Sequence, residues 1–344
     1  MSTSPPKVLI WGIAGASLGM EIAKSLAMDG GFDVRGADIS PQAYGHFAGC
    51  FSTTYVLNKE NCNNDVCNIL ATEHINFLIA GGDIVARICA GIEEDVKATG
   101  ATYVGNNQAT VRNCSDKYTC FGLLAQKGVA CPQTLLLSEI DIYATSTIYP
   151  LITKPRIDSG GSRGINVFYS AEDLAGFAAQ HGADADAWVC QEYLQDSGNE
   201  LTIGVLSQSN GTAAGSILLR RSFQNMLSVH DRSQDHLISS GSSQGQFYRD
   251  KEAENVAMSI ANAVESTGPL NIQCRLKHGV IMAFEINPRF SASTFLRALA
   301  GVNEVSLYLN HLISGRDIAY PEPAEGLALR SFAECFVPKN SELK

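Results

Sequence analysis

Short apolar runs alternate with helix-like segments over the first third of the chain. Strands are expected at 7–11, 32–40, 75–83 and 101–105, and helices at 20–30 and 84–99. Buried strands separated by helices are typical of a parallel sheet that carries helices on both faces. Residues 1–109 are therefore predicted to form a Rossmann-like, doubly wound α/β domain.

The pattern changes after this first segment and predicts an α+β architecture for the rest of the chain. Helices are expected at 115–128, 171–182, 251–266 and 293–314, and strands at 149–156, 165–170, 188–195, 200–208 and 212–221. Ser115 is the expected N-cap of the first of these helices. Residues 222–247 are polar without apolar periodicity, so they predict a long loop. Residues 270–289 predict a hairpin that turns at Lys277–Gly279.

Composition narrows the class of protein. The chain has 344 residues, of which 45% are hydrophobic and 17% charged, as in ordinary globular proteins. Its net charge of -10 argues against a nucleic-acid partner. No run approaches the roughly 18 apolar residues of a membrane span, and the start MSTSPPKVLIWG is unlike a signal peptide. The 10 cysteines contain no CxxC pair. A cytoplasmic protein with reduced thiols and no membrane partner is expected.

A glycine-rich turn, GIAGASLG (12–19), follows the first strand, and Asp38 ends the second. This arrangement allows an NAD-dependent dehydrogenase, with Asp38 on a ribose. The spacing is GxxGxxxG rather than the GxGxxG of dinucleotide folds. The alternative is structural, because glycines let a helix N-terminus pack closely against a strand.

Four features that follow one another along the chain suit the binding of a nucleoside triphosphate. Lys117 lies early in a helix, Lys154 ends a buried strand, and the glycine loop SGGSRG (159–164) comes next. Two lysines can neutralise phosphates from two sides, and a glycine loop can present backbone N–H groups. The fourth feature is the pairing of Gln273 with the run FEINPR (284–289) on the predicted hairpin. Each feature alone has an ordinary structural explanation, but their joint occurrence in this order favours phosphate chemistry.

The predicted hairpin carries candidate metal ligands. Glu285 and Asn287 are two residues apart and share one face of a strand, and Gln273 can point the same way from the partner strand. Such oxygen ligands suit Mg²⁺, which keeps phosphates and waters as its other ligands. Arg289 extends the same face and can hold a transferred phosphoryl group or a developing oxyanion.

These residues resemble the ATP-grasp superfamily, in particular the carbamoyl-phosphate synthase large subunit, biotin carboxylase and the ATP-grasp amino-acid ligases. The resemblance implies an ATP-grasp module over 110–344, with a lid subdomain at about 119–188 and a catalytic subdomain at about 189–344. It implies ATP and Mg²⁺ as cofactors, with Mn²⁺ as an alternative metal.

The resemblance also assigns roles to individual positions. It implies phosphate- and adenine-side basic residues at Lys117 and Lys154, a flexible loop of Ser159, Gly160, Gly161, Ser162 and Arg163, an adenine-binding hinge of Gln191, Glu192, Tyr193 and Leu194, a ribose-binding acid at Glu200, metal ligands at Gln273, Glu285 and Asn287, and an arginine beside the acyl phosphate at Arg289. Lys154, Arg289 and Arg297 are the candidate catalytic residues. Arg297, Arg220, Arg221 and the polar residues 222–247 are candidates for binding the substrate carboxylate.

The sequence departs from the family at two of these places. Gln273 is neutral where the first metal ligand is commonly acidic, although the carbamoyl-phosphate synthases also have glutamine there. Ala292 stands where those synthases have a second arginine, which argues against bicarbonate as the substrate.

The resemblance implies an ADP-forming ligase that converts a small-molecule carboxylate into an acyl phosphate and passes the acyl group to an amine or another nucleophile. The dehydrogenase, a non-catalytic ATP-binding module and a kinase-like enzyme that releases the acyl phosphate are the alternatives. A homodimer is the default assembly, since two-fold oligomers are the commonest.

Overall fold

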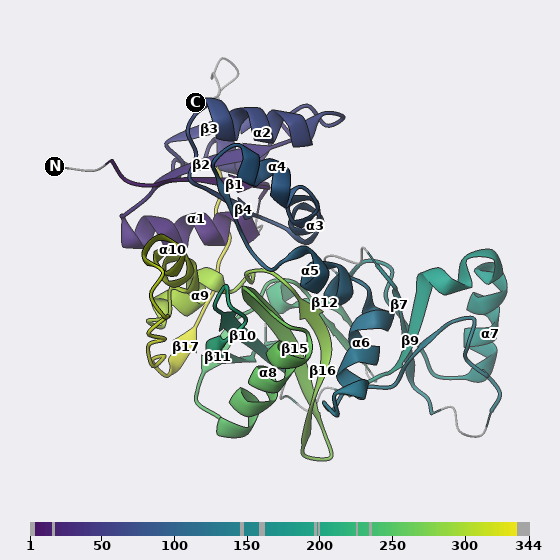
Figure 1. Ribbon diagram of the computed structural model, residues 1–344. Helices are drawn as coiled ribbons and strands as arrows, with labels where there is room; N and C mark the ends of the chain where they lie inside the picture. The colour runs from purple at the N-terminus through teal and green to yellow at the C-terminus, as the bar shows by residue number, and fades with distance from the viewer. Residues whose placement is uncertain are drawn as a thin grey trace.

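The computed structural model describes residues 4–15, 18–144, 148–157, 162–195, 198, 200–224, 226–233 and 236–335. Figure 1 shows an N-terminal sheet with its helices above a large antiparallel sheet, and a smaller sheet with helix α7 (Ala171–Gln180) to one side. None of the described helices has the length and apolar character that crossing a bilayer requires. The mixed α/β and α+β fold class expected from the sequence is confirmed.

The N-terminal sheet is parallel, with strand order β3-β2-β1-β4-β5. Its strands are β1 (Lys7–Trp11), β2 (Asp33–Asp38), β3 (Thr53–Val56), β4 (Phe77–Ala80) and β5 (Thr102–Val104). Its helices are α1 (Leu18–Asp29), α2 (Cys62–Thr72), α3 (Asp83–Gly91) and α4 (Glu93–Ala98). The expected strands and helix 20–30 are present. β3 and α2 were not expected, and the helix expected at 84–99 is divided at Ile92.

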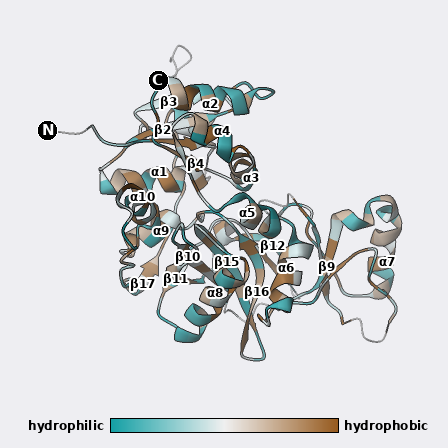
Figure 2. Ribbon diagram, in the orientation of Figure 1, coloured by the Kyte–Doolittle hydropathy of each residue, from teal (hydrophilic) through white to brown (hydrophobic). Residues whose placement is uncertain are grey.

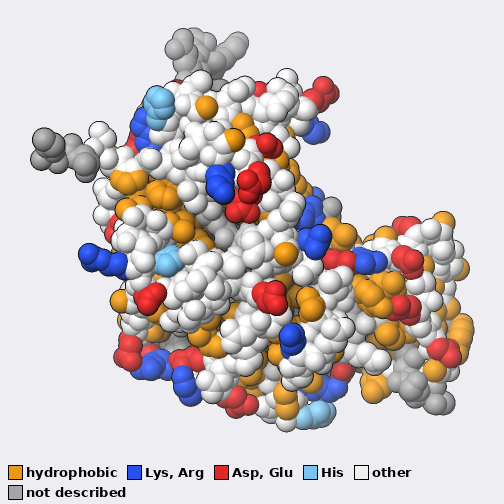
Figure 3. All heavy atoms as spheres, in the orientation of Figure 1, with side chains coloured by type: hydrophobic (Ala, Val, Ile, Leu, Met, Phe, Trp, Pro, Cys, Tyr) orange, Lys and Arg blue, Asp and Glu red, His pale blue; other side chains and the backbone are white. Residues whose placement is uncertain are grey.

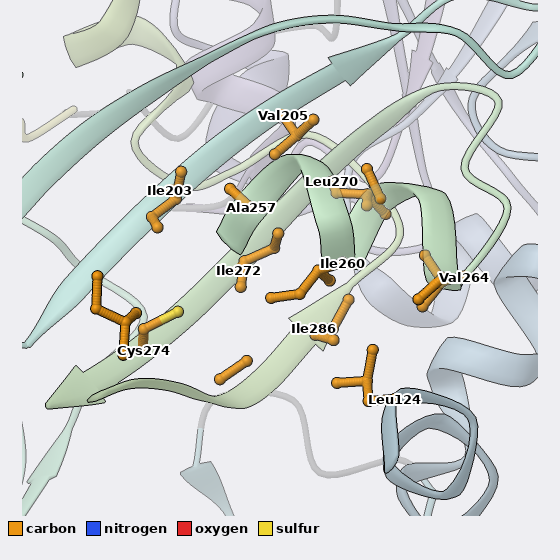
Figure 4. Close-up of a cluster of buried hydrophobic side chains, with 14 of the residues drawn as sticks. Leu124, Ile203, Val205, Ala257, Ile260, Val264, Leu270, Ile272, Cys274 and Ile286 are labelled. Atoms are coloured by element: carbon orange, nitrogen blue, oxygen red, sulfur yellow. The ribbon is translucent and has the colours of Figure 1, made fainter. Parts of the chain in front are cut away.

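The large sheet forms the base of the molecule, with strand order β16-β15-β10-β11-β14-β17. Its strands are β10 (Leu201–Ser207), β11 (Ala213–Arg221), β14 (Gly245–Phe247), β15 (Pro269–Lys277), β16 (Val280–Asn287) and β17 (Gly326–Ala328). Helix α8 (Lys251–Ala263) packs on this sheet, and their buried apolar side chains meet in one cluster (Figure 4). Hydrophobic residues concentrate on these inner strands, and hydrophilic residues lie on the outer faces of α2 and α8 (Figure 2).

The smaller sheet has strand order β6-β9-β7-β8. It is built from β6 (Thr134–Leu136), β7 (Leu151–Pro155), β8 (Asn166–Phe168) and β9 (Trp188–Glu192). Helix α7 packs on it through buried Leu174.

On the face of the molecule in Figure 3, acidic and basic side chains are interspersed, and neither sign dominates.

Three further expectations about local structure are wrong. Ser115 ends helix α5 (Gln108–Ser115), and the N-cap of α6 (Lys117–Gln126) is Asp116, whose carboxylate accepts the N–H groups of Tyr118 and Thr119. Residues 222–247 were expected to form a loop, but they contain three strands: β12 (Val229–Arg232), β13 (Leu237–Ser239) and β14. These strands are too short to produce a periodic pattern of apolar residues.

The third concerns the helix expected at 293–314. It is divided into α9 (Thr294–Leu299) and α10 (Glu304–Ser314), and Gly301 adopts a positive φ of 92° between them. The predicted hairpin at 270–289 is present as β15 and β16, with Gly279 at a positive φ in its turn.

Candidate functional site

Three cavities meet at Glu285, near the end of β16. The large cavity, of about 320 Å³, lies between α3, α5, α6 and residues 285–289. The hinge cavity, of about 50 Å³, lies between β7, β9 and the β15–β16 hairpin. The serine cavity, of about 60 Å³, is lined by residues that include Ser239, Ser240, Ser243 and Ser291. Glu285 lines all three, so its carboxylate marks the centre of the candidate site.

The three predicted metal ligands lie together. Gln273 and Glu285 are cross-strand partners, and Gln273 Nε2 donates to Glu285 Oε2 at 3.0 Å. Asn287 Nδ2 donates to Glu285 Oε1 at 3.1 Å. A carboxylate and two amide side chains on adjacent strands suit a hard cation with few protein ligands, although in this structure the amides turn their nitrogens, not their oxygens, towards the carboxylate. No cluster of three or more His, Cys, Asp or Glu side chains that could hold a metal occurs among the described residues.

The two predicted lysines line the hinge cavity from different elements. Lys154, on β7, is buried, and its Nζ donates to Gln191 Oε1 at 2.9 Å and to the Phe284 carbonyl at 3.2 Å. Burial lowers the pKa of Lys154 to about 8, although the charge of Glu285 opposes this shift. Lys117, the first residue of α6, donates from Nζ to the Pro155 carbonyl at 3.0 Å and also lines the large cavity. Both ammonium groups can therefore reach an anion beside Glu285.

Only part of the predicted glycine loop is described. Ser159, Gly160 and Gly161 lie outside the described residues. Ser162 lines the hinge and serine cavities, and its Oγ donates to the Ser239 carbonyl at 2.9 Å. Arg163 lines the large cavity. The described end of the loop thus lies where all three cavities approach one another.

The predicted hinge residues 191–194 all line the hinge cavity. Gln191 Nε2 donates to Thr134 Oγ1, and Glu192 forms an ion pair with Lys277. Tyr193 Oη donates to the Leu237 carbonyl at 3.0 Å and accepts its N–H at 2.7 Å. Leu237 and Ile238 close the cavity from β13, which the sequence did not predict as a strand. The cavity wall is apolar where Ile152, Ile165, Phe284 and these residues meet, as a flat heteroaromatic ring requires.

Glu200, predicted to bind a ribose, does not line the hinge cavity. It is fully buried between Arg221 and Arg275, neither of which the resemblance had paired with Glu200. Arg221 Nη1 donates to Oε1 at 3.0 Å, and Arg275 donates twice to Oε2, at 2.9 and 2.6 Å. Arg275 also binds the carbonyls of Leu194 and Leu237. Glu200 therefore holds Arg275, which ties the hinge to β13, and Arg221, which binds the carbonyls of Ser228 and Ser240.

The candidate substrate-binding arginines are distributed unevenly. Arg221 lines the serine cavity, and its Nη1 donates to Gln273 Oε1 at 3.3 Å. The Arg220 guanidinium lies over the Tyr248 ring, 4.3 Å from its centroid. Arg297 is 1% exposed and lines none of the three cavities, because it is paired with Glu304 in the interior. Direct contact of Arg297 with a substrate is thus not supported.

Arg289 lines the large and serine cavities and has a partner that the sequence did not indicate. Its Nε and Nη2 donate to the two carboxylate oxygens of Asp83, at 2.7 and 3.0 Å. Although burial opposes the shift, Arg289 lowers the pKa of Asp83. Asp83 begins α3, the helix that follows strand β4 of the N-terminal sheet, so the N-terminal part of the chain contributes a wall of the site. Only the unusual sequence GGD after a buried strand could have drawn attention to it.

The first glycine turn has a structural explanation. Asp38 is buried, and its carboxylate accepts the N–H of Ile13 at 2.8 Å and the N–H of Ser40 at 2.9 Å. A Cβ on Gly19 would lie 2.0 Å from the Gly12 carbonyl oxygen, so close packing requires glycine there. Asp38 is thus engaged by the turn, and the dinucleotide interpretation gains no support.

Comparison with known proteins links the second half of the chain to a family model. Residues 184–335 match a family model described as ATP-grasp in the biosynthetic pathway with Ter operon. The carbamoyl phosphate synthase large chain of Neisseria meningitidis is 22% identical over 245 residues, which cover 69% of this chain. The match covers 22% of that relative, so the chain corresponds to about a fifth of its length.

Solved structures show the same fold. The L-amino acid ligase from Bacillus licheniformis has a TM-score of 0.67 at 14% identity, covering 91% of this chain and 75% of that one. The D-alanine–D-alanine ligase from Bacillus anthracis, complexed with ATP, has a TM-score of 0.58 at 16% identity, covering 90% and 96%. The biotin carboxylase from Campylobacter jejuni has a TM-score of 0.67 at 14% identity, covering 92% and 72%. The chain thus resembles the ATP-grasp superfamily in sequence, and it has the ATP-grasp fold.

Proposed function

We propose that this protein is an ATP-dependent, ADP-forming ligase that activates a small-molecule carboxylate as an acyl phosphate. The observation that carries the proposal is the position of Glu285, flanked by Gln273 and Asn287, at the junction of a lysine-lined cavity and an arginine-lined cavity. The proposed units are an N-terminal α/β domain at 1–109 and an ATP-grasp module at 110–344, with a lid at about 119–188 and a catalytic part at about 189–344.

The hinge cavity is the proposed place of the adenine ring. Its apolar wall suits the two ring faces, and the backbone at 191–194 suits the ring edge. Lys154 and Lys117 are aimed at the phosphates, and the buried site strengthens their electrostatic interaction with anions. Gln273, Glu285 and Asn287 would hold Mg²⁺, which supplies positive charge to the β- and γ-phosphates.

The arginine side of Glu285 is the proposed place of chemistry. A carboxylate oxygen of the substrate forms a bond to the γ-phosphorus, and the bond from that phosphorus to the bridging oxygen of ADP breaks. Arg289, oriented by both oxygens of Asp83, can stabilise the negative charge on the transferring group. An amine or another nucleophile then attacks the acyl carbon and releases phosphate.

The large cavity is the proposed place of the substrate. Its walls include apolar side chains from three helices, namely Ile84, Val85, Val111, Cys120 and Phe121. Its charged edge carries four basic side chains, Arg87, Lys117, Arg163 and Arg289, and the two carboxylates of Asp83 and Glu285. A carboxylate with an apolar body satisfies both surfaces, since its charge can face the arginines while its body is removed from water.

The test is carboxylate-dependent ADP release from MgATP, measured with amino acids and other acids singly and in pairs. We expect release to require an acid and to fall at least about a hundredfold in Glu285→Gln, because the metal-binding charge is lost. Glu252→Gln, an exposed change on α8, is the matched control. Wild-type protein that binds MgATP but releases no ADP with any acid pair would favour a non-catalytic module. Absence of ATP binding would refute the proposal.

A further inference from the structure

The interior behind β15 contains a buried ion pair that the proposed mechanism does not use. Arg297 on α9 and Glu304 at the start of α10 are each 1% exposed, and Arg297 Nη1 donates to Glu304 Oε2 at 2.9 Å. Removing two charges from water is costly, and such a pair adds little net stability over apolar residues of similar volume. A role in orienting a neighbour is therefore worth testing.

That neighbour is Asn271 on β15. Arg297 Nη2 donates to Asn271 Oδ1 at 2.8 Å, and Thr202 Oγ1 donates to the same oxygen at 2.9 Å. A guanidinium has only donors, so Asn271 must turn its oxygen towards Arg297. Its Nδ2 group must then point away from the ion pair.

The freed amide group faces the candidate site. Asn271 lines the serine cavity with Gln273, Glu285, Arg289 and Ser291. Asn271 and Gln273 are two residues apart on β15, so they share one face of the sheet. No acceptor for Asn271 Nδ2 occurs among the described residues, and this nitrogen is not sealed from solvent. Its two N–H donors are thus available to a ligand in the cavity.

The opposite strand leaves room for this arrangement. Gly204 on β10 is the cross-strand partner of Asn271. A Cβ on Gly204 would lie 2.1 Å from Arg297 Nη1 and 2.5 Å from Glu304 Oε1. Any side chain at position 204 would displace the guanidinium, so the ion pair between Arg297 and Glu304 requires glycine at this position.

We propose that Arg297, held by Glu304, is a positioning residue that turns the amide donors of Asn271 onto the γ-phosphoryl group in the serine cavity. This inference rests on the proposed binding of MgATP. Arg297 acts through Asn271, which explains how an arginine away from the cavities can matter to the site. Asn271 adds a neutral donor beside Arg289 and Glu285.

The test compares the affinities of MgATP and MgADP by calorimetry. Asn271→Asp keeps an oxygen for both Arg297 and Thr202 but replaces the donors with a negative oxygen. We expect MgATP to bind about tenfold to a hundredfold more weakly, as for the loss of a charge-assisted hydrogen bond, with MgADP within about twofold. Asn262→Asp, an exposed change on α8, is the control and should change neither affinity.

A second variant tests the positioning residue. In Arg297→Gln combined with Glu304→Gln, the pair is neutral, and glutamine can present either its oxygen or its nitrogen to Asn271. We expect a selective loss of MgATP affinity in this double variant and a smaller loss in Arg297→Lys, which keeps a donor-only group. Asn271→Asp that binds MgATP like the wild type, or that loses MgATP and MgADP equally, would overturn the inference. Wild-type protein that binds neither nucleotide would instead refute the proposed function, which the wild-type titration alone reveals.

Discussion

The candidate site depends on side chains whose environment differs from the one that their sequence position suggests. The sequence correctly placed Gln273, Glu285 and Asn287 together, because a two-residue period on paired strands is a local rule. It assigned Glu200 and Arg297 to ligands, whereas both are buried in ion pairs. Burial and partners depend on elements far away in the chain, so the residue type alone could not distinguish a ligand-binding charge from an internal one.

Lys154 should make nucleotide affinity depend on pH. Burial lowers its pKa to about 8, and a bound anion favours the protonated form. Protonation is complete well below pH 8, so MgATP affinity should be constant there and fall by up to about tenfold per pH unit above it. Titrations of MgATP from pH 6.5 to about 9.5 check this. Lys154→Met should bind MgATP weakly and show no such fall in affinity above pH 8. A fall that persists in this variant would refute the assignment of the pH dependence to Lys154.

At the scale of elements, strong periodicity was a good guide and short elements were not. The hairpin β15–β16 and helices α1 and α8 are where the sequence placed them. Strands of three or four residues, such as β12, β13 and β14, are too short to show a period, so residues 222–247 looked like a loop. Yet Leu237 and Ile238 of β13 close the hinge cavity.

Helix α6 is set by Asp116, and through it the position of Lys117. Asp116 caps the helix and accepts two hydrogen bonds from Arg156, at 2.9 and 2.6 Å. Asp116→Ala should cost about 1–2 kcal/mol of unfolding free energy through the lost cap and should weaken MgATP binding. Ser115→Ala is the matched control, since Ser115 ends α5 and provides no cap. Urea unfolding measures the unfolding free energy of both variants, and equal losses in Asp116→Ala and Ser115→Ala would contradict the structure.

Strand β13 is held to the hinge by Tyr193. Its hydroxyl makes two hydrogen bonds with the backbone of Leu237, so Tyr193→Phe leaves a buried N–H and carbonyl with one partner fewer. We expect a loss of about 1–3 kcal/mol of unfolding free energy and weaker MgADP binding. Tyr143→Phe changes an exposed ring and serves as the control. Unchanged MgADP affinity in Tyr193→Phe would show that β13 does not close the nucleotide site.

At the scale of the whole molecule, the N-terminal sheet is part of the site rather than an appendage. Asn106 Nδ2 donates to the Pro269 carbonyl at 2.7 Å, and Arg330 pairs with Glu21 at 3.0 Å. Arg289 and Asp83 join the same two parts although 206 residues separate them. The sequence predicted the parallel N-terminal sheet and several strands of the large sheet, but contacts over such separations leave no local pattern, so it could not predict how the sheets meet.

Asp83 should therefore affect chemistry more than nucleotide binding. Asp83→Ala releases Arg289 from its two hydrogen bonds, and we expect carboxylate-dependent ADP release to fall about tenfold to a thousandfold, the range for misplaced electrostatic groups. MgADP affinity should stay within about twofold of the wild type, because Asp83 does not line the hinge cavity. Asp95→Ala, an exposed change on α4, is the control. A parallel loss of MgADP affinity would place Asp83 in nucleotide binding instead.

The most direct test of the central claim is to trap the activated acid. Hydroxylamine converts an acyl phosphate into a stable hydroxamate, so MgATP, hydroxylamine and a panel of carboxylic acids should yield hydroxamate and ADP in equal amounts with one or more acids. Glu285→Gln should yield neither, while Glu252→Gln should behave like the wild type. Hydroxamate that forms equally in Glu285→Gln, or ADP release without hydroxamate for every acid, would contradict activation of a carboxylate at this site.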